Sequence, residues 1–198
     1  MGHFRNLTIL VSPHPTDILG IPMKRGANLN LPNRLTLGRI FLVPLLVVFL
    51  LSSSRINSII ATAIFLAAAI TDWLDGLIAR RTRQITALGK LLDPLADKLL
   101  ICAAFISLVQ SGRIPAWMVV VIVCRELAIT GLRGIAASKN IVVASGWWGK
   151  YKMVSQILAI VLLILEAPFS MVATWLALTL TVISGVDYAV RFIGSHWE

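Results

Sequence analysis

Six long runs of apolar residues divide the chain, and they limit its possible folds more strongly than anything else in it. They cover about Leu35–Ser54, Ser58–Ala79, Leu91–Val109, Ile114–Ala137, Val154–Ala167 and Ser170–Ile193. A helix needs roughly 20 mostly apolar residues to cross a bilayer, and these runs reach or approach that length. Within lipid, the backbone polar groups must be satisfied inside the segment itself. The sequence therefore predicts an all-α, polytopic integral membrane protein with six transmembrane helices.

The composition agrees with one membrane domain. Of the 198 residues, 58% are hydrophobic, which is more than an ordinary soluble domain contains. The net charge of +9 could indicate a nucleic-acid partner. In a chain with long apolar runs, however, it is better explained as a membrane orientation signal, so we expect no nucleic-acid partner.

Lysine and arginine lie predominantly on one side of the predicted bundle. If the N-terminus is cytoplasmic, that side collects Lys24, Arg25, Arg34, Arg39, Arg80, Arg81, Arg83, Lys90, Lys139, Lys150, Lys152 and Arg191. The other side keeps Arg55 and Arg113. Cytoplasmic segments carry the excess of basic residues, so we expect a multi-pass protein of the inner (cytoplasmic) cell membrane with both termini in the cytoplasm.

The N-terminal residues do not fit the helical plan. Residues 1–27 contain VSPHPTDILGIP and are expected to be irregular or disordered, whereas residues 28–198 form the six-helix membrane domain. A translation start at Met23 is an alternative beginning of the chain. The stretch NLPNRLTLGRI predicts a short interfacial segment that enters the first span.

Four of the nine acidic residues lie in one short window, Thr71 to Lys98. Asp72 and Asp75 are three residues apart and Asp93 and Asp97 four apart, so on helices each pair shares a face. Four carboxylates at one membrane boundary would repel each other, and burying ionised groups is expensive. Two divalent cations about 3.5–4 Å apart would remove the conflict, as in two-metal displacement at phosphorus. Oxygen ligands suit Mg²⁺ or Mn²⁺, with Ca²⁺ possible. Ion pairing of the four aspartates with nearby basic residues is the less favoured alternative.

The whole pattern around these aspartates is Asp72-x2-Asp75-Gly76-x2-Ala79-Arg80-x8-Gly89-x3-Asp93-x3-Asp97. It resembles the signature of the CDP-alcohol phosphatidyltransferases. The resemblance implies a membrane enzyme, usually a homodimer, that transfers a phosphatidyl group from a CDP-linked lipid to an alcohol and releases CMP. It also implies that the four aspartates hold two metal ions, Mg²⁺ or Mn²⁺, and that Asp97 is the catalytic base. The CDP site would be lined by Gly76, Ala79, Arg80 and Gly89.

Basic residues further along the chain point to the acceptor. Arg125 and Arg133 lie inside the fourth apolar run, eight residues apart and so on roughly one helix face. Ionisable groups at such depth usually face a cavity with a function. Lys150 and Lys152 precede the fifth run at the same expected membrane boundary. The four cations predict a binding site for an acceptor phosphate; side chains that reach toward the interface, with Glu126 as an ion-pair partner, are the alternative.

A further resemblance implies which phosphorylated acceptor this is, namely sn-glycerol 3-phosphate. The stretches NLPNRLTLGRI, RELAITGLRG, GKYKMVSQ and SGVDY resemble bacterial phosphatidylglycerophosphate synthases, over residues from about 28 to 190. That resemblance implies CDP-diacylglycerol as donor and phosphatidylglycerophosphate and CMP as products, in phosphatidylglycerol and cardiolipin biosynthesis. Inositol phosphate, serine or phosphatidylglycerol are alternative acceptors within the family. A small cation transporter is the alternative from another class, although its acids would be spread along a crossing path.

Overall fold

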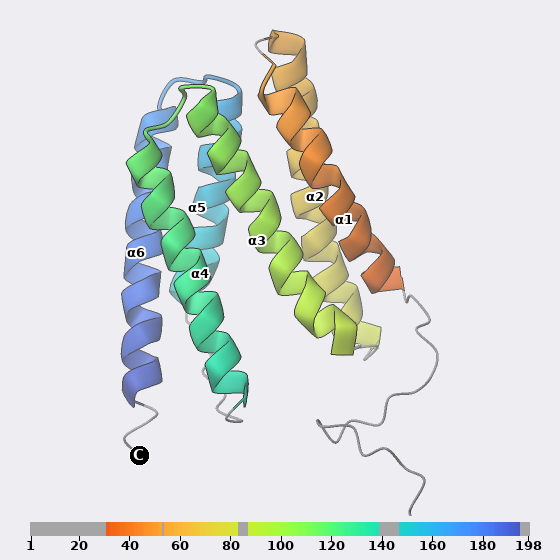
Figure 1. Ribbon diagram of the computed structural model, residues 1–198, viewed down its shortest axis with the longest axis vertical. Coiled ribbons are helices and arrows are strands. Elements are labelled where there is room, and N and C mark those ends of the chain that lie inside the picture. The colour runs from red at the N-terminus through yellow and green to blue at the C-terminus, as the bar shows by residue number, and fades with distance from the viewer. Residues whose placement is uncertain (1–30, 53, 83–86, 139–146, 195–198) are drawn as a thin grey trace, which may run out of the picture.

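The computed structural model describes residues 31–52, 54–82, 87–138 and 147–194, with side chains described over 36–52, 54–71, 95–136 and 147–194. These ranges form six α-helices and no strand (Figure 1). The helices are α1 (Leu31–Leu50), α2 (Arg55–Thr82), α3 (Ala87–Gln110), α4 (Ala116–Ser138), α5 (Trp147–Ile164) and α6 (Ser170–Gly194). The all-α class is confirmed, and each expected apolar run corresponds to one helix. The irregular extension expected over residues 1–27 lies outside the described residues.

Four helices, α1, α2, α3 and α5, begin earlier than the apolar runs predict. From Leu31 onward, the expected interfacial segment is the first part of α1 rather than a separate element. Pro32 is compatible with this start because a proline in the first turn of a helix loses no intrahelical hydrogen bond. Helix α5 begins at Trp147, and its early polar residue Lys152 is buried in the protein. Because lysine is charged, a hydropathy pattern argues against including Lys152 in a span. Its buried position in the fold nevertheless favours a helix there.

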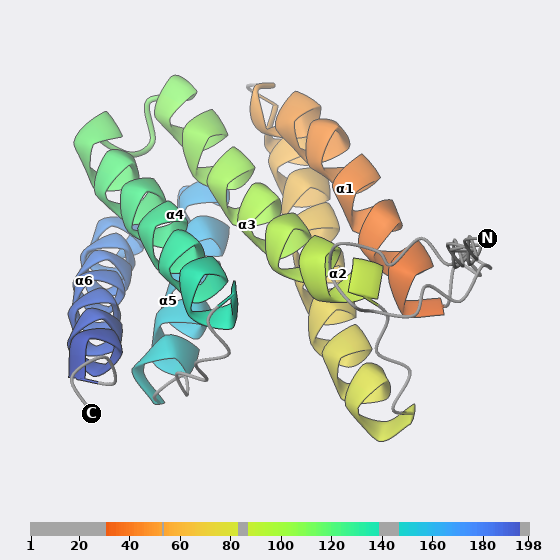
Figure 2. The ribbon, with the colours of Figure 1, turned by 60° about the horizontal axis from the view of Figure 1, so that its bottom comes forward.

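The helices form two groups that α3 joins. Helix α1 packs against α2 and α3, while α6 packs against both α4 and α5. Helix α3 also contacts α4 and α5, and α2 contacts α5. Figure 2 shows α4, α5 and α6 on one side of the molecule and α1, α2 and α3 on the other. Because α3 runs along the boundary, a residue on it can face helices from both groups.

Among the described side chains, the main apolar cluster lies toward one end of the bundle. The turns that join α1 to α2, α3 to α4 and α5 to α6 are at this end, uppermost in Figure 1. Large side chains buried near it include Phe65, Phe105, Leu108, Met118 and Ile160. Helices α3 and α4 meet at their short turn and diverge toward the opposite end (Figure 1). Close packing therefore fixes one end, and the other end accommodates polar side chains.

The turn between α3 and α4 fixes the ends of two further helices. Gly112 has φ +70° there, a left-handed conformation that glycine adopts without steric cost. The hydroxyl of Ser111 donates to the carbonyl of Leu50 at 3.2 Å, at the end of α1. Arg113 Nη1 donates to the carbonyl of Ile164 at 2.9 Å, at the end of α5. One turn thus satisfies carbonyl groups that a helix end leaves without an intrahelical partner.

Within the described residues, one helix, Ser170–Gly194, is long and apolar enough to cross a membrane. The apolar parts of two others, Thr36–Leu50 and Arg55–Thr71, are shorter. Large apolar side chains are exposed on the outside of several helices, among them Phe41, Val48, Trp117 and Val172. Extensive exposed apolar surface of this kind indicates contact with a membrane or another apolar partner.

Candidate active site

A pocket of about 250 Å³ with many charged lining residues opens between α3, α4, α5 and α6, in the half of the bundle away from the short turns. Its charged lining residues are Asp97, Lys98, Arg125, Glu126, Arg133, Lys150, Lys152 and Asp187. Four separate helices contribute them, so the pocket exists only once the bundle has assembled. Five of these residues are site residues expected from the sequence: the candidate base Asp97 and the four cations expected to bind the acceptor phosphate.

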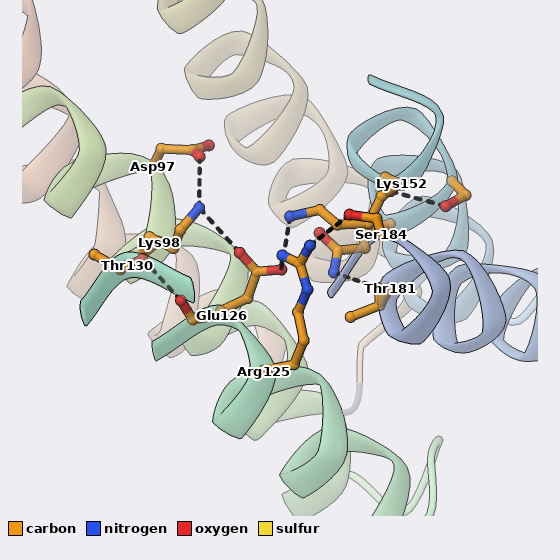
Figure 3. A network of polar contacts seen from close by, with 10 residues as sticks. Asp97, Lys98, Arg125, Glu126, Thr130, Lys152, Thr181 and Ser184 are labelled. Carbon is orange, nitrogen blue, oxygen red and sulfur yellow. Dashed lines mark hydrogen bonds and ion pairs between the residues drawn. The ribbon is translucent and has the colours of Figure 1, made fainter. Parts of the chain in front are cut away.

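Glu126 is the centre of the charge network in this pocket. Its side chain is 2% exposed. Its Oε1 atom accepts from Lys152 Nζ at 2.6 Å and from Arg125 Nη1 at 3.1 Å, and Lys98 Nζ lies 2.9 Å from Oε2 (Figure 3). A buried carboxylate is stable only when its charge is matched and its lone pairs are satisfied, and these three cations do both.

Arg125 is held from α6 as well as by Glu126. Its Nη2 atom donates to the hydroxyl of Ser184, which is buried on α6 (Figure 3). The aliphatic part of Arg125 lies directly on Gly185, where a Cβ atom would come within 3.1 Å of both Cγ and Nε of the arginine. The absence of a side chain at Gly185 therefore lets Arg125 lie against the α6 backbone.

Arg133 and Lys150 have different surroundings from Arg125 and Lys152. The guanidinium of Arg133 lies 5.2 Å from the centre of the Tyr188 ring, and Lys150 Nζ lies 4.5 Å from that of Trp147. Both contacts are cation–π interactions. Within the described part of the chain, the structure gives neither residue a carboxylate partner. Their positive charges are therefore less neutralised than those that surround Glu126.

Asp97 faces the same network from α3. Its Oδ2 atom lies 3.6 Å from Lys98 Nζ, the ammonium group that also contacts Glu126 (Figure 3). Lys98 thus stands between the candidate base and the cations of the expected phosphate site. Asp187, which also lines the pocket, pairs with Arg191 on its own helix at 3.0 Å.

The side chains of the other expected site residues lie outside the described set. Asp72, Asp75, Gly76, Ala79 and Arg80 are in α2, and Gly89 and Asp93 are in α3. The backbone is helical at both aspartate pairs, so the two residues of each pair share a helix face. Carboxylate oxygens at such spacing fit a hard divalent cation. Among the side chains that are described, no three His, Cys, Asp or Glu residues gather as metal ligands, so the metal site stays a prediction.

The sequence did not predict that Glu126 pairs with Lys98 and Lys152. The ion pair considered for Glu126 was with Arg125 or Arg133; the structure pairs it with Arg125 but also with Lys98 and Lys152. A lone glutamate inside an apolar run was the available signal, because such a charge needs buried partners. Which cations it meets depends on the rotation and packing of three helices, and no local pattern contains that information.

Comparison with known proteins settles the family. The family model described as CDP-alcohol phosphatidyltransferase matches residues 29–183. The chain belongs to the CDP-alcohol phosphatidyltransferase family. The family expected from the aspartate motif is therefore confirmed, and membership makes the chain a transferase rather than a cation transporter.

Individual members of the family are similar over most of this chain. A Bacillus subtilis protein named CDP-diacylglycerol–glycerol-3-phosphate 3-phosphatidyltransferase is 41% identical, over 85% of this chain and 96% of its own. A protein of Mycobacterium tuberculosis named probable phosphatidylglycerophosphate synthase is 38% identical, over 94% of this chain and 90% of its own. A Haemophilus influenzae protein with the same name as the first is 37% identical, over 66% of this chain and 73% of its own.

Proposed function

We propose that this CDP-alcohol phosphatidyltransferase transfers the phosphatidyl group of CDP-diacylglycerol to sn-glycerol 3-phosphate, forming phosphatidylglycerophosphate and CMP. The observation that carries the proposal is the pocket in which four cations and Asp97 meet. The names of the similar proteins support the same donor and acceptor. This reaction is a step toward phosphatidylglycerol and cardiolipin.

The acceptor phosphate would bind to Arg125, Arg133, Lys150 and Lys152. Arg133 and Lys150 offer charges that no described carboxylate neutralises, and guanidinium groups bind phosphate oxygens in a bidentate manner. A pocket of about 250 Å³ accommodates a small phosphorylated alcohol. Serine or phosphatidylglycerol would bring no phosphomonoester to this group of cations.

The donor would bind beside the four aspartates of α2 and α3. Gly76, Ala79, Arg80 and Gly89 would line the CDP site, and Asp72, Asp75, Asp93 and Asp97 would hold two divalent ions. The family generally depends on divalent metal, and oxygen ligands favour Mg²⁺ or Mn²⁺. When bound, such ions supply positive charge to the attacking and leaving oxygens of a phosphoryl-type transfer.

The protein's own residues account for the movement of the proton and of the leaving group. The acceptor hydroxyl oxygen attacks the phosphorus that carries diacylglycerol, and its proton passes to the carboxylate of Asp97. The bond from this phosphorus to the CMP oxygen breaks, and Arg80 pairs with the phosphate of the departing CMP. The pocket cations hold the acceptor in place, so its hydroxyl can be directed at the donor.

The same proposal includes six membrane spans, a cytoplasmic site in the inner membrane and a homodimer. Exposed apolar side chains on several helices besides α6 support lipid contact. Arg55 and Arg113 are at the end with the short turns, while Arg133, Lys150 and Arg191 are toward the other end. Since cytoplasmic boundaries collect basic residues, this distribution favours a pocket that opens to the cytoplasm.

The test is an acceptor comparison with purified protein, CDP-diacylglycerol and Mg²⁺. CMP release is measured with glycerol 3-phosphate, glycerol, inositol phosphate and serine side by side. We expect glycerol 3-phosphate to be used at least tenfold better than unphosphorylated glycerol or serine, because a charge-assisted phosphate contact contributes about 1.5–3 kcal/mol. Equal use of glycerol or serine would show that the cations do not select the acceptor, and preference for inositol phosphate would assign a different member of the family.

A further inference from the structure

The two oxygens of Glu126 face different parts of the pocket. Oε1 accepts from Arg125 and Lys152, two of the cations assigned to the acceptor phosphate. Oε2 is 2.9 Å from Lys98, whose ammonium also lies 3.6 Å from Asp97. One buried carboxylate thus contacts both the phosphate-binding side and, through Lys98, the candidate base (Figure 3).

Three cations of the pocket pair with Glu126. Lys98, Arg125 and Lys152 come from three helices, α3, α4 and α5, and their like charges repel one another in a largely buried site. Lysine and arginine side chains are long and lose several rotamers when they are fixed. Each of the three makes a close contact with Glu126, and the structure gives Lys152 no other carboxylate partner among the described residues.

We propose that Glu126 is a positioning residue of the acceptor site. It orients Arg125 and Lys152 toward the acceptor phosphate and fixes that phosphate relative to Asp97 through Lys98. This inference rests on the proposed function, since it assumes a phosphorylated acceptor. Glu126 itself, being an anion whose oxygens are occupied by the three cations, does not bind the phosphate.

Positioning and simple charge neutralisation predict opposite results. If Glu126 only lowered the positive charge of the pocket, its removal would leave a more cationic site and would strengthen binding of an anionic acceptor. If it positions the cations, its removal frees them and weakens binding in spite of the added positive charge. The sign of the change in acceptor affinity therefore separates the two roles.

The experiment measures three quantities for wild type, Glu126→Gln and Glu126→Asp: the KM for glycerol 3-phosphate, the KM for CDP-diacylglycerol, and the inhibition constant of inorganic phosphate competing with the acceptor. For Glu126→Gln we expect the acceptor KM and the phosphate constant to rise roughly tenfold or more, while the donor KM changes less than about threefold. Glu166→Gln is the matched control, because Glu166 is the exposed partner of Arg113 at the opposite end of the bundle. It should leave all three quantities as in wild type.

Glu126→Asp decides the question if Glu126→Gln does not fold. Aspartate keeps the charge but is shorter by one carbon–carbon bond, about 1.5 Å, so it cannot reach the three cations at once. Positioning predicts a raised acceptor KM, whereas neutralisation predicts wild-type values. An unchanged or lowered acceptor KM in the folded variants overturns the inference. If wild type itself makes no product from glycerol 3-phosphate, the proposed function fails, and the inference fails with it.

Discussion

Arg133 and Lys150 differ from the other cations of the pocket in what their charges meet. Arg125 and Lys152 contact the buried Glu126, whereas Arg133 and Lys150 contact the rings of Tyr188 and Trp147. A cation–π contact orders a side chain without neutralising it, so both charges are available to an anion. Among single residues, Arg133 should therefore contribute strongly to acceptor binding.

Replacing Arg133 by alanine should raise the KM for glycerol 3-phosphate about ten- to a hundredfold, because a charge-assisted contact to phosphate contributes about 1.5–3 kcal/mol. The donor KM should change little, since the expected nucleotide site belongs to α2 and α3. Steady-state kinetics with each substrate varied in turn would measure both. Arg55→Ala, at the far end of the bundle, is the control for loss of a surface arginine. Equal effects on both substrates would place Arg133 outside the acceptor site.

Gly185 offers a change that moves a cation without removing any charge. A methyl group there would lie 3.1 Å from Cγ and Nε of Arg125, so the arginine must shift. We expect Gly185→Ala to raise the acceptor KM roughly three- to tenfold, about 0.6–1.4 kcal/mol. Gly131→Ala on α4 is the matched control, because its added methyl would meet nothing within 4 Å. A wild-type acceptor KM for Gly185→Ala would show that the position of Arg125 is unimportant.

At the scale of the helices, the turn between α3 and α4 connects elements that are far apart in the sequence. Ser111 reaches the end of α1, and Arg113 reaches the end of α5 and, at 3.4 Å, the hydroxyl of Ser58 on α2. Arg113 also pairs with Glu166 at 2.8 Å, but the Glu166 side chain is 68% exposed. The carbonyl contact, being less exposed to water, should contribute more to stability than the ion pair.

Arg113→Ala should therefore destabilise the folded protein by about 1–3 kcal/mol, because the carbonyl of Ile164 loses a charged donor. Glu166→Gln removes only the exposed ion pair and should cost at most about 1 kcal/mol. Melting temperatures of purified protein, followed by helical circular dichroism, would compare the two. Activity per folded molecule should stay at the wild-type level in both, since the pocket lies toward the other end. An equal loss of stability in the two variants would assign the effect to the ion pair instead.

At the scale of the whole molecule, the sequence predicted the elements better than the contacts between them. Long apolar runs gave six helices because helix formation in such segments is a local property. The spacing of Arg125 and Arg133 predicted a shared face, and the structure brings both into one pocket with Asp97. The fifth apolar run is short for a span, and α5 gains length from the stretch WWGKYKM before it, where Lys152 is buried.

The partners of the charged residues could not be predicted in the same way. Glu126 pairs with cations from three helices. Arg113 contacts Ile164 and Ser58, which are 51 and 55 residues away in sequence. Such contacts depend on how each helix is rotated against its neighbours. The metal site stays a prediction for a related reason: the spacing of the aspartates on α2 and α3 is helical, but their side-chain positions are described only for Asp97.

The metal prediction concerns the whole molecule because it requires α2 and α3 to bring their carboxylates together. If Asp72, Asp75, Asp93 and Asp97 hold two divalent ions, activity should fall to background in excess chelator and return with Mg²⁺ or Mn²⁺. Ca²⁺ should restore little turnover, because its longer and more variable coordination positions the reacting groups poorly. CMP release measured across a titration of each metal would test this. Full activity in excess chelator would contradict the metal assignment and would leave the four carboxylates to be explained by ion pairs with basic neighbours.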